Sequence, residues 1–205
     1  MSQNQNFFVK GVNLPKTELG QAKFDRLVKE AESLFTAKSF FDVSVADICR
    51  AAGTAVGTFY IYFTGKTDLY RYLIAHYKHE IKHALALAIK SCTTRAQKER
   101  EGIRCFVKYA VANPTVYNII WGCLAVEREM FVDYYVSFAN SYCKALSQDP
   151  DALKNEDVTS LAYMLMGITN FLGLRAIFEN MSEEEIDSTI DNAVTTVLTK
   201  GMFQS

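Results

Sequence analysis

The stretch from Val43 to Tyr70 constrains the fold of this chain more than any other part. It reads VSVADICRAAGTAVGTFYIYFTGKTDLY and predicts two short helices joined by a tight turn, followed by a longer helix. Ser44 is expected to cap the first helix through its hydroxyl, with Asp47 completing an acidic capping box. Gly53 stands where the chain must turn through a left-handed conformation, which glycine adopts at little cost.

The second helix of this stretch is predicted from about Ala55 to Phe63, with Thr54 as its expected N-cap. It is too short to be stable alone, and it is expected to expose Thr58, Tyr60 and Tyr62. A helix, a glycine turn and a short second helix together indicate the helix-turn-helix motif of DNA-binding proteins.

At these residues the chain resembles the TetR family of bacterial transcriptional regulators. The matching segments occur in the order of the family's signature, and no gap is needed to align them. They are SVADI from 44, AG from 52, GTFY from 57, YF from 62 and KTDL from 66. The resemblance covers roughly residues 19–73; beyond them it depends only on length and an all-helical pattern. It implies an all-α fold in which an N-terminal three-helix helix-turn-helix domain precedes a C-terminal helical domain for ligand binding and dimerisation.

The predicted organisation is an arm at 1–16, a DNA-binding domain at 17–66 and an effector-binding and dimerisation domain at 67–205. About nine helices and no strand are expected. Beside the two short helices, the pattern predicts helices at 17–38, 67–90, 99–112, 115–130, 131–146, 156–180 and 182–200, with loops at 91–99 and 147–155.

The charge is distributed unevenly along the chain. Residues 1–90 hold 12 Lys and Arg against 8 Asp and Glu, a net +4, whereas residues 91–205 hold 10 against 15, a net −5. The two values add up to the overall −1. A basic first part and an acidic second part are typical of a nucleic-acid-binding module joined to a domain of another kind.

Cysteine usage and hydropathy indicate a cytoplasmic protein. The five cysteines include no CxxC pair, which is typical of free thiols in a reducing compartment. No stretch approaches ~18 uncharged apolar residues, so no membrane span is predicted. The first residues lack the features of a signal peptide. No catalytic or cofactor motif such as GxSxG, a Walker loop or HExxH is present, so neither an enzyme nor a cofactor is expected.

The resemblance implies which residues contact double-stranded operator DNA. The second helix of the motif enters the major groove. It contains no Arg, Lys, Asn or Gln, so bidentate base readout is not available to it. Its apolar groups and one hydroxyl would contact thymine methyls and single base edges. The implied groove residues are Thr54, Ala55, Val56 and Thr58, and the implied phosphate contacts are Ser44, Tyr60, Tyr62 and Lys66.

The aromatic residues of the second part are candidates for an effector pocket, since ligand cavities between helices are mostly apolar with a few polar groups. Ordinary core packing is the alternative for each of them. Glu127 is a candidate partner for a cationic ligand, with a solvated surface position as its alternative. The candidate pocket residues are Tyr109, Tyr117, Trp121, Glu127, Tyr134, Phe138 and Phe171.

The mechanism that the resemblance implies is repression relieved by a small hydrophobic or aromatic ligand, with activation as the less common outcome. The ligand would tilt the long helix from Thr67 and change the spacing of two DNA-reading helices. A homodimer through the last two helices is expected, because two such helices must reach successive major grooves. Burial within one subunit is the alternative for both apolar stripes. These are Leu161, Met164, Leu165, Ile168, Phe171 and Leu172, and Ile186, Ile190, Val194, Val197 and Leu198.

Two further features leave alternatives open. His76, His79 and His83 share one helix face, and they favour either a tolerant polar surface or a metal-binding protein or enzyme. The arm at 1–16 is a loosely ordered lead, a segment docked through Phe7 and Phe8, or a minor-groove arm that uses Lys10 and Lys16.

Overall fold

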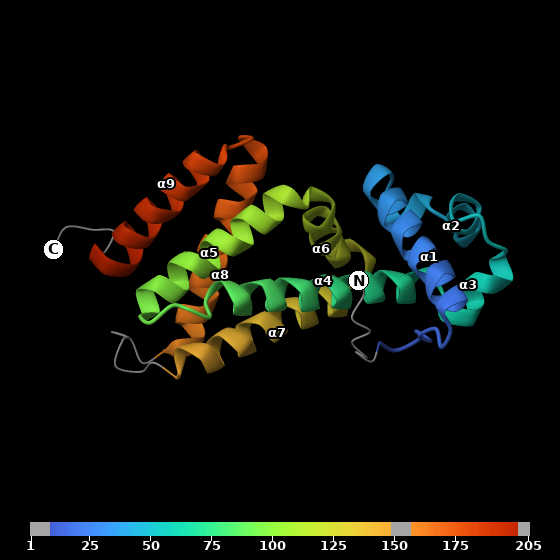
Figure 1. Ribbon diagram of the computed structural model, residues 1–205, viewed down its shortest axis with the longest axis horizontal. Helices are drawn as coiled ribbons and strands as arrows, with labels where there is room; N and C mark the ends of the chain where they lie inside the picture. The colour runs from blue at the N-terminus through green and yellow to red at the C-terminus, as the bar shows by residue number, and fades with distance from the viewer. Residues whose placement is uncertain (1–8, 149–156, 201–205) are drawn as a thin grey trace. The chain divides into compact units, whose positions relative to one another are not determined.

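The computed structural model describes residues 9–148 and 157–200. Within these ranges the chain forms nine α-helices (Figure 1) and no strand, apart from an isolated antiparallel bridge between Val12 and Phe63. The expected all-α fold is therefore confirmed. The α-helices are α1 Glu18–Ala37, α2 Val45–Ala51, α3 Val56–Tyr62, α4 Lys66–Ala88, α5 Arg95–Ala112, α6 Pro114–Val126, α7 Arg128–Leu146, α8 Val158–Phe178 and α9 Glu183–Ala193.

Two shorter segments complete the described helical structure, a 3-10 turn at Phe40–Asp42 (η1) and a π-helical segment at Val194–Lys200 (η3). The expectations for Phe7 and Phe8, for most of the loop at 147–155 and for the side chain of Leu198 lie outside the described residues.

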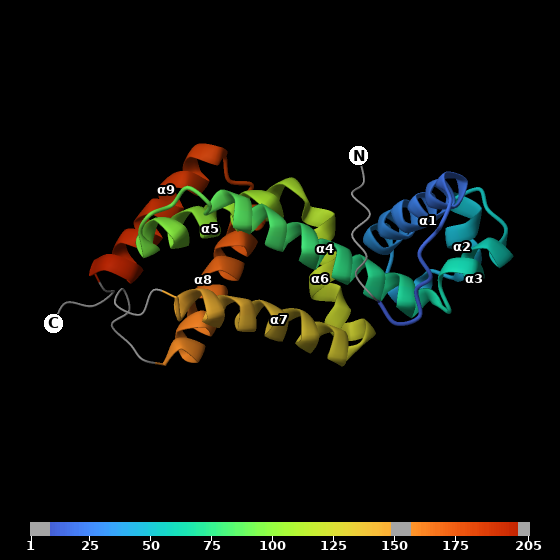
Figure 2. The ribbon, with the colours of Figure 1, turned by 60° about the horizontal axis from the view of Figure 1, so that its bottom comes forward.

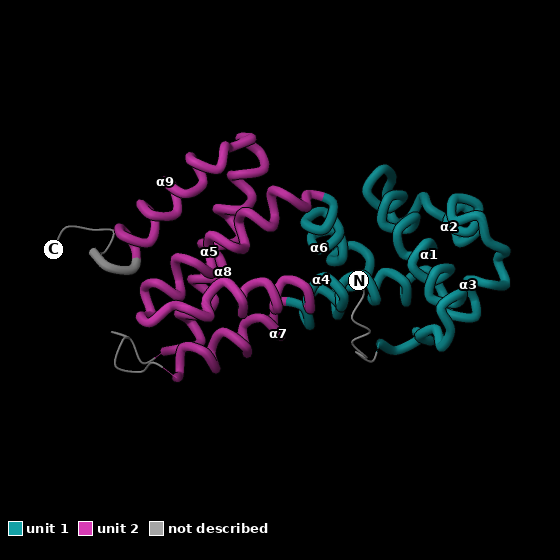
Figure 3. The backbone as a smooth tube through the Cα atoms, viewed as in Figure 1, with its two compact units in different colours: residues 1–78, 115–134 teal, residues 79–114, 135–205 magenta. Residues whose placement is uncertain are grey.

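The chain divides into two compact units (Figure 3). Unit 1 contains residues 1–78 and 115–134, and unit 2 contains residues 79–114 and 135–205. Unit 1 thus combines the helix-turn-helix with the first part of α4, with α6 and with the first turns of α7. The domain limits expected from the sequence, 1–16, 17–66 and 67–205, remain a prediction.

The core of unit 1 forms around Phe24 of α1, which is fully buried. Its ring stacks on Phe63 at 5.1 Å and meets Tyr62 edge-on at 5.5 Å. Leu27, Ala31 and Phe35 continue this buried face at helical spacing. The Thr17 hydroxyl accepts from the Gly20 amide and caps α1 as expected.

Helix α6 packs against the first turns of α4 in unit 1. The Tyr70 hydroxyl donates to the Ile119 carbonyl at 2.7 Å. The two helices approach closely at Gly122, where an added Cβ would lie 3.0 Å from the Tyr70 hydroxyl oxygen. A segment far away in the sequence is therefore fixed to the helix that follows the DNA-binding motif.

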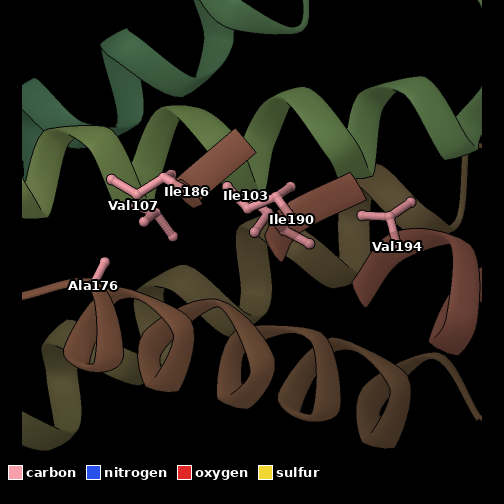
Figure 4. Packing of buried hydrophobic residues seen from close by; sticks show 6 residues of the cluster. All are labelled: Ile103, Val107, Ala176, Ile186, Ile190 and Val194. Atoms are coloured by element: carbon pink, nitrogen blue, oxygen red, sulfur yellow. The ribbon is translucent and has the colours of Figure 1, made fainter. Parts of the chain in front are cut away.

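Unit 2 buries a cluster shared by α5, α8 and α9 (Figure 4), and α9 lies alongside α5 in two views (Figures 1 and 2). Ile103 and Val107 of α5 contact Ile186 and Ile190 of α9, which are about 1–2% exposed. The expectation that the α9 stripe pairs with a second subunit is therefore wrong for these residues, because α5 already covers them. An ion pair of 2.9 Å between Arg104 of α5 and Asp187 of α9 lies beside this cluster.

Several element boundaries differ from those expected, and the helix predicted at 182–200 continues beyond Ala193 as the π-helical η3. Helix α5 begins at Arg95, inside the predicted connector, because Thr94 and Gln97 form a capping box at its start. The predicted helix at 115–130 ends earlier, and α7 begins at Arg128. The single residue between α6 and α7 is Glu127, whose carboxylate is used in unit 1 as described below.

Helix α8 is long and apolar enough to cross a membrane by length and composition, in contrast to the expectation that the chain has no such stretch. Only 22% of its most apolar window is buried within the subunit. Its outer face carries Tyr163, Met164, Phe171 and Phe178, all exposed. Within the part of the chain that the structure describes, helix α8 therefore presents an exposed apolar surface.

Candidate nucleic-acid interface

Helix α2 begins with the expected capping box. The Ser44 hydroxyl accepts from the Asp47 amide at 3.1 Å, and the Asp47 carboxylate accepts from the Ser44 amide at 3.0 Å. Hydrogen bonds from the Ser44 hydroxyl and amide lower the pKa of Asp47 to about 2, so the cap remains ionised at neutral pH. Ser44 is exposed at the start of α2, where the family resemblance implies a phosphate contact.

The turn between α2 and α3 takes place at Gly53, which has a φ of 60° as expected. The expectation that Thr54 caps α3 is wrong. Helix α3 begins at Val56, and its N-cap is Ala55, which makes no side-chain capping bond. The Thr54 hydroxyl oxygen is instead buried. Thr54 precedes the N-cap by one residue, so its side chain does not reach the first amides of α3.

The outer face of α3 consists of apolar groups, a phenol and a glycine. Val56, Tyr60 and Ile61 are 44%, 55% and 61% exposed, respectively. Ala55 and Gly57 are exposed beside them, and Thr58 is half-buried. A Cβ added at Gly57 would meet no atom within 4 Å. This face can make van der Waals contacts with a groove, but it offers no bidentate hydrogen-bonding group.

Tyr62 belongs to the core, and the expectation that α3 exposes it is wrong. Its side chain is 7% exposed, and its hydroxyl donates to the Gly20 carbonyl of α1 at 3.2 Å. The aromatic contact with Phe24 explains this burial. Tyr62 therefore fixes α3 to α1, and its implied phosphate contact remains an untested prediction.

Lys66, the first residue of α4, is half-buried against the turn before α2. Its ammonium donates to the carbonyls of Phe40 and Val43 and lies 4.1 Å from the centroid of the Phe40 ring. Desolvation lowers the pKa of Lys66, and the charge of Asp42 opposes that shift. The residue expected to contact phosphate thus also joins α4 to η1.

We expect Lys66→Ala to weaken DNA binding and to reduce stability by about 1–2 kcal/mol, because two backbone acceptors lose their donor. The slope of log affinity against log salt should flatten by about one if the ammonium also contacts a phosphate. Lys66→Gln is the matched control, since its amide can donate to the carbonyls without a charge. It should recover stability but not the slope. A wild-type slope in both variants would remove Lys66 from the phosphate contacts.

Arg50 is an exposed cation that is not among the DNA contacts expected from the sequence. Its guanidinium lies 2.9 Å from the Asp47 carboxylate, and its side chain is 77% exposed. The sequence feature that could have indicated this contact is the position of Arg50 in the last turn of α2, next to the glycine turn. Arg50 is thus available for a phosphate contact near the capping residues of the same helix.

A chain of polar contacts in unit 1 connects the turn after α3 to the junction of α6 and α7. Thr64 donates from its hydroxyl to Asp68, and Asp68 accepts a further bond from Arg71. Arg71 also makes two bonds to the carboxylate of Glu127, at 2.8 and 2.7 Å. Asp68 is one of two buried charged residues among those described, so its partners determine what it contributes to stability.

The predicted effector residues are divided between the two units, and their role in a pocket remains a prediction. In unit 1, Glu127 binds Arg71, and Trp121 packs between Tyr117 and Phe131, with 6.2 Å between the ring centroids in each case. Tyr117 and Tyr134 are buried. The remaining three residues belong to unit 2: Tyr109 donates to Glu80, Phe138 lies 5.1 Å from the Lys82 ammonium, and Phe171 is exposed on the outer face of α8.

The alternative of a histidine metal site receives no support. Among residues 9–148 and 157–200, no three His, Cys, Asp or Glu side chains are grouped so that they could hold an ion. His76 stacks on Tyr72 at 6.0 Å, and His79 stacks on His83 at 6.5 Å. These contacts use the rings as flat packing surfaces.

Comparison with known proteins relates the first part of the chain to bacterial regulators. Residues 27–73 match the family model described as bacterial regulatory proteins, tetR family. Over 84 residues, 41% of this chain, the sequence is 31% identical to the uncharacterized HTH-type transcriptional regulator YwcC of Bacillus subtilis. Over 56 residues it is 38% identical to the regulator YvdT of the same organism. These matches span only 34% and 28% of the two relatives.

The fold is similar to solved structures over nearly the whole chain. The fatty acid degradation regulator FadR from Bacillus halodurans superposes with a TM-score of 0.75 at 15% identity, covering 93% of this chain and all of that one. FadR from Bacillus subtilis, solved in complex with stearoyl-CoA, gives 0.73 at 15% identity, covering 86% of this chain and 98% of that one. These likenesses concern the fold.

Proposed function

Since the chain belongs, through its helix-turn-helix, to the TetR family of bacterial regulatory proteins, we propose that it is a homodimeric DNA-binding repressor released from its operator by a hydrophobic ligand. The observation that carries this proposal is the outer face of α3. Val56, Tyr60 and Ile61 are exposed on a helix that α1 holds from behind through Phe24 and Tyr62. A soluble domain has little other reason to expose three large apolar groups on a helix of seven residues.

In the proposed complex α3 lies in the major groove, with Ala55, Val56 and Thr58 facing base edges. Ser44, Tyr60, Lys66 and the additional Arg50 contact phosphates on either side. Because phosphate contacts supply most of the affinity and α3 has few polar base-reading groups, sequence discrimination by one subunit is modest. A dimer that contacts two half-sites multiplies that discrimination.

The proposed dimer forms through the outer face of α8. Met164, Phe171 and Phe178 follow one another at intervals of seven residues, so they lie along one side of the helix. Gly167 lies between the first two, and a Cβ added to it would meet nothing within 4 Å, which leaves space for a second helix. A second copy of the same helix is an apolar partner of matching length, and bacterial regulators of this kind use twofold symmetry. A cytoplasmic dimer would thereby cover the surface that α8 exposes.

The proposed effector is hydrophobic. The FadR structure with stearoyl-CoA supports acyl thioesters as the first class to test. Coupling to DNA would use the contacts of unit 1, where α6 and the α6–α7 junction bind α4 through Tyr70 and Arg71. A ligand changes DNA affinity only by as much as its affinity differs between the two states of the protein.

The experiment that tests this function selects double-stranded sequences from a random pool with the purified protein. We expect enrichment of a palindromic duplex with half-sites about one helical turn, or a multiple, apart. The affinity for that duplex should fall steeply with salt. Failure to retain any duplex at low ionic strength would refute DNA binding.

The effector is then tested on the selected duplex with stearoyl-CoA and with free CoA as its control. Release by stearoyl-CoA alone, together with a raised melting temperature of the free protein, would support an acyl ligand. Equal effects of the two compounds would refute recognition of the acyl chain, while leaving the DNA result unchanged.

A further inference from the structure

The segment from Val9 to Asn13 lies along the end of α3 instead of extending freely from α1. The Asn13 amide donates to the Tyr62 carbonyl at 2.7 Å, and the Thr64 amide donates to the Gly11 carbonyl at 3.1 Å. Val12 lies between these two bonds in the antiparallel bridge to Phe63. We call residues 9–13 the strap.

The strap provides donors that the end of α3 lacks. The last carbonyls of a helix have no intrahelical partner, and a helix of seven residues has few bonds of its own to hold it. Asn13 serves two of these carbonyls, since its side-chain amide also donates to Ile61 at 3.2 Å. Ile61 and Tyr62 are thus held from outside the helix-turn-helix motif.

Gly11 fixes the register of the strap. Its φ is 78°, a conformation that residues with a Cβ rarely adopt. A Cβ placed there would overlap the buried carboxylate of Asp68 in the first turn of α4. Only glycine therefore lets the strap approach α4 closely enough for its carbonyl to reach Thr64.

We propose that the strap holds the C-terminal half of α3 in the orientation that reads DNA, with Asn13 and Gly11 as positioning residues. The inference rests on the proposed function, since it concerns how the same helix is presented to DNA. It assigns residues 9–13 of the arm to the end of α3, in place of a direct contact with the minor groove. Lys10, which is exposed on the strap, is not required for this role.

The first test measures binding of Asn13→Ala to the duplex selected by the wild-type protein and to a scrambled duplex. Loss of one hydrogen-bond donor should lower affinity for the selected duplex about three- to tenfold. Affinity for the scrambled duplex and the salt slope should stay unchanged, because no phosphate contact is lost. Asn13→Gln, which keeps the amide donor, should recover part of the loss.

The second test is hydrogen exchange of the α3 amides in the free protein, which does not depend on DNA. Asn13→Ala and Gly11→Ala should speed exchange in α3 several-fold, because local opening of the helix becomes easier. Lys10→Ala is the matched control on the same segment and should not change it.

Unchanged α3 exchange in both Asn13→Ala and Gly11→Ala would overturn the proposal. So would a flatter salt slope in Lys10→Ala combined with unaltered α3 exchange in Asn13→Ala, which would indicate a direct contact with DNA. If the wild-type protein selects no duplex, the proposed function fails, and the exchange data still decide whether the strap holds α3.

Discussion

Phe171→Asp is expected to convert the protein into a monomer that remains folded. The side chain is 69% exposed in the subunit, so the substitution removes little packing there. In the proposed dimer the same position lies in the middle of an apolar interface, where an unpaired carboxylate is strongly unfavourable. Because a monomer contacts one half-site at a time, apparent affinity for the full operator should fall by about 10²–10⁴-fold.

Sedimentation and operator titration check this result together. Leu87→Asp is the matched control, since Leu87 is an apolar residue of α4 that is similarly exposed. It should remain dimeric and bind normally. A Phe171→Asp protein that still sediments as a dimer would show that another surface joins the subunits.

Arg71→Ala should lower the free energy of unfolding by about 2–4 kcal/mol, because it leaves buried Asp68 and half-buried Glu127 without their cation. Glu127→Gln should lower it by only about 1 kcal/mol, since Asp68 keeps its partner. Urea unfolding of both variants measures the two values.

A double-mutant cycle of Arg71→Ala, Glu127→Ala and Arg71→Ala/Glu127→Ala isolates the contribution of the pair itself. If the three variants show strictly additive losses, Arg71 and Glu127 are not coupled. The link between the α6–α7 junction and the turn after α3 would then not depend on this ion pair.

Local signals in the sequence were sufficient to predict much of the helix-turn-helix. Ser44 and Asp47 fall three residues apart before an apolar pattern, and Gly53 stands where only a left-handed residue continues the chain. Each of these features depends only on residues that are close to it in the sequence. The pattern of Phe24, Leu27 and Ala31 likewise determined the buried face of α1 without reference to any other helix.

The features that could not be predicted depend on partners far away in the sequence. Tyr62 looked like a surface residue of a short helix until α1 supplied Phe24 and the Gly20 carbonyl. The stripe of Ile186 and Ile190 suits either a partner subunit or a neighbouring helix, and periodicity alone does not distinguish them. Asn13 appeared to belong to a loose arm, because nothing near it indicated two acceptors about 48 residues later.

The open surroundings of Gly57 have a consequence for how this protein can acquire new targets. The position is exposed in α3, and a Cβ built there meets no atom within 4 Å. Side chains that read bases, such as those of arginine or asparagine, can therefore be introduced at this one position. The set of DNA sequences that the protein recognises can then change while the fold of the helix-turn-helix stays the same.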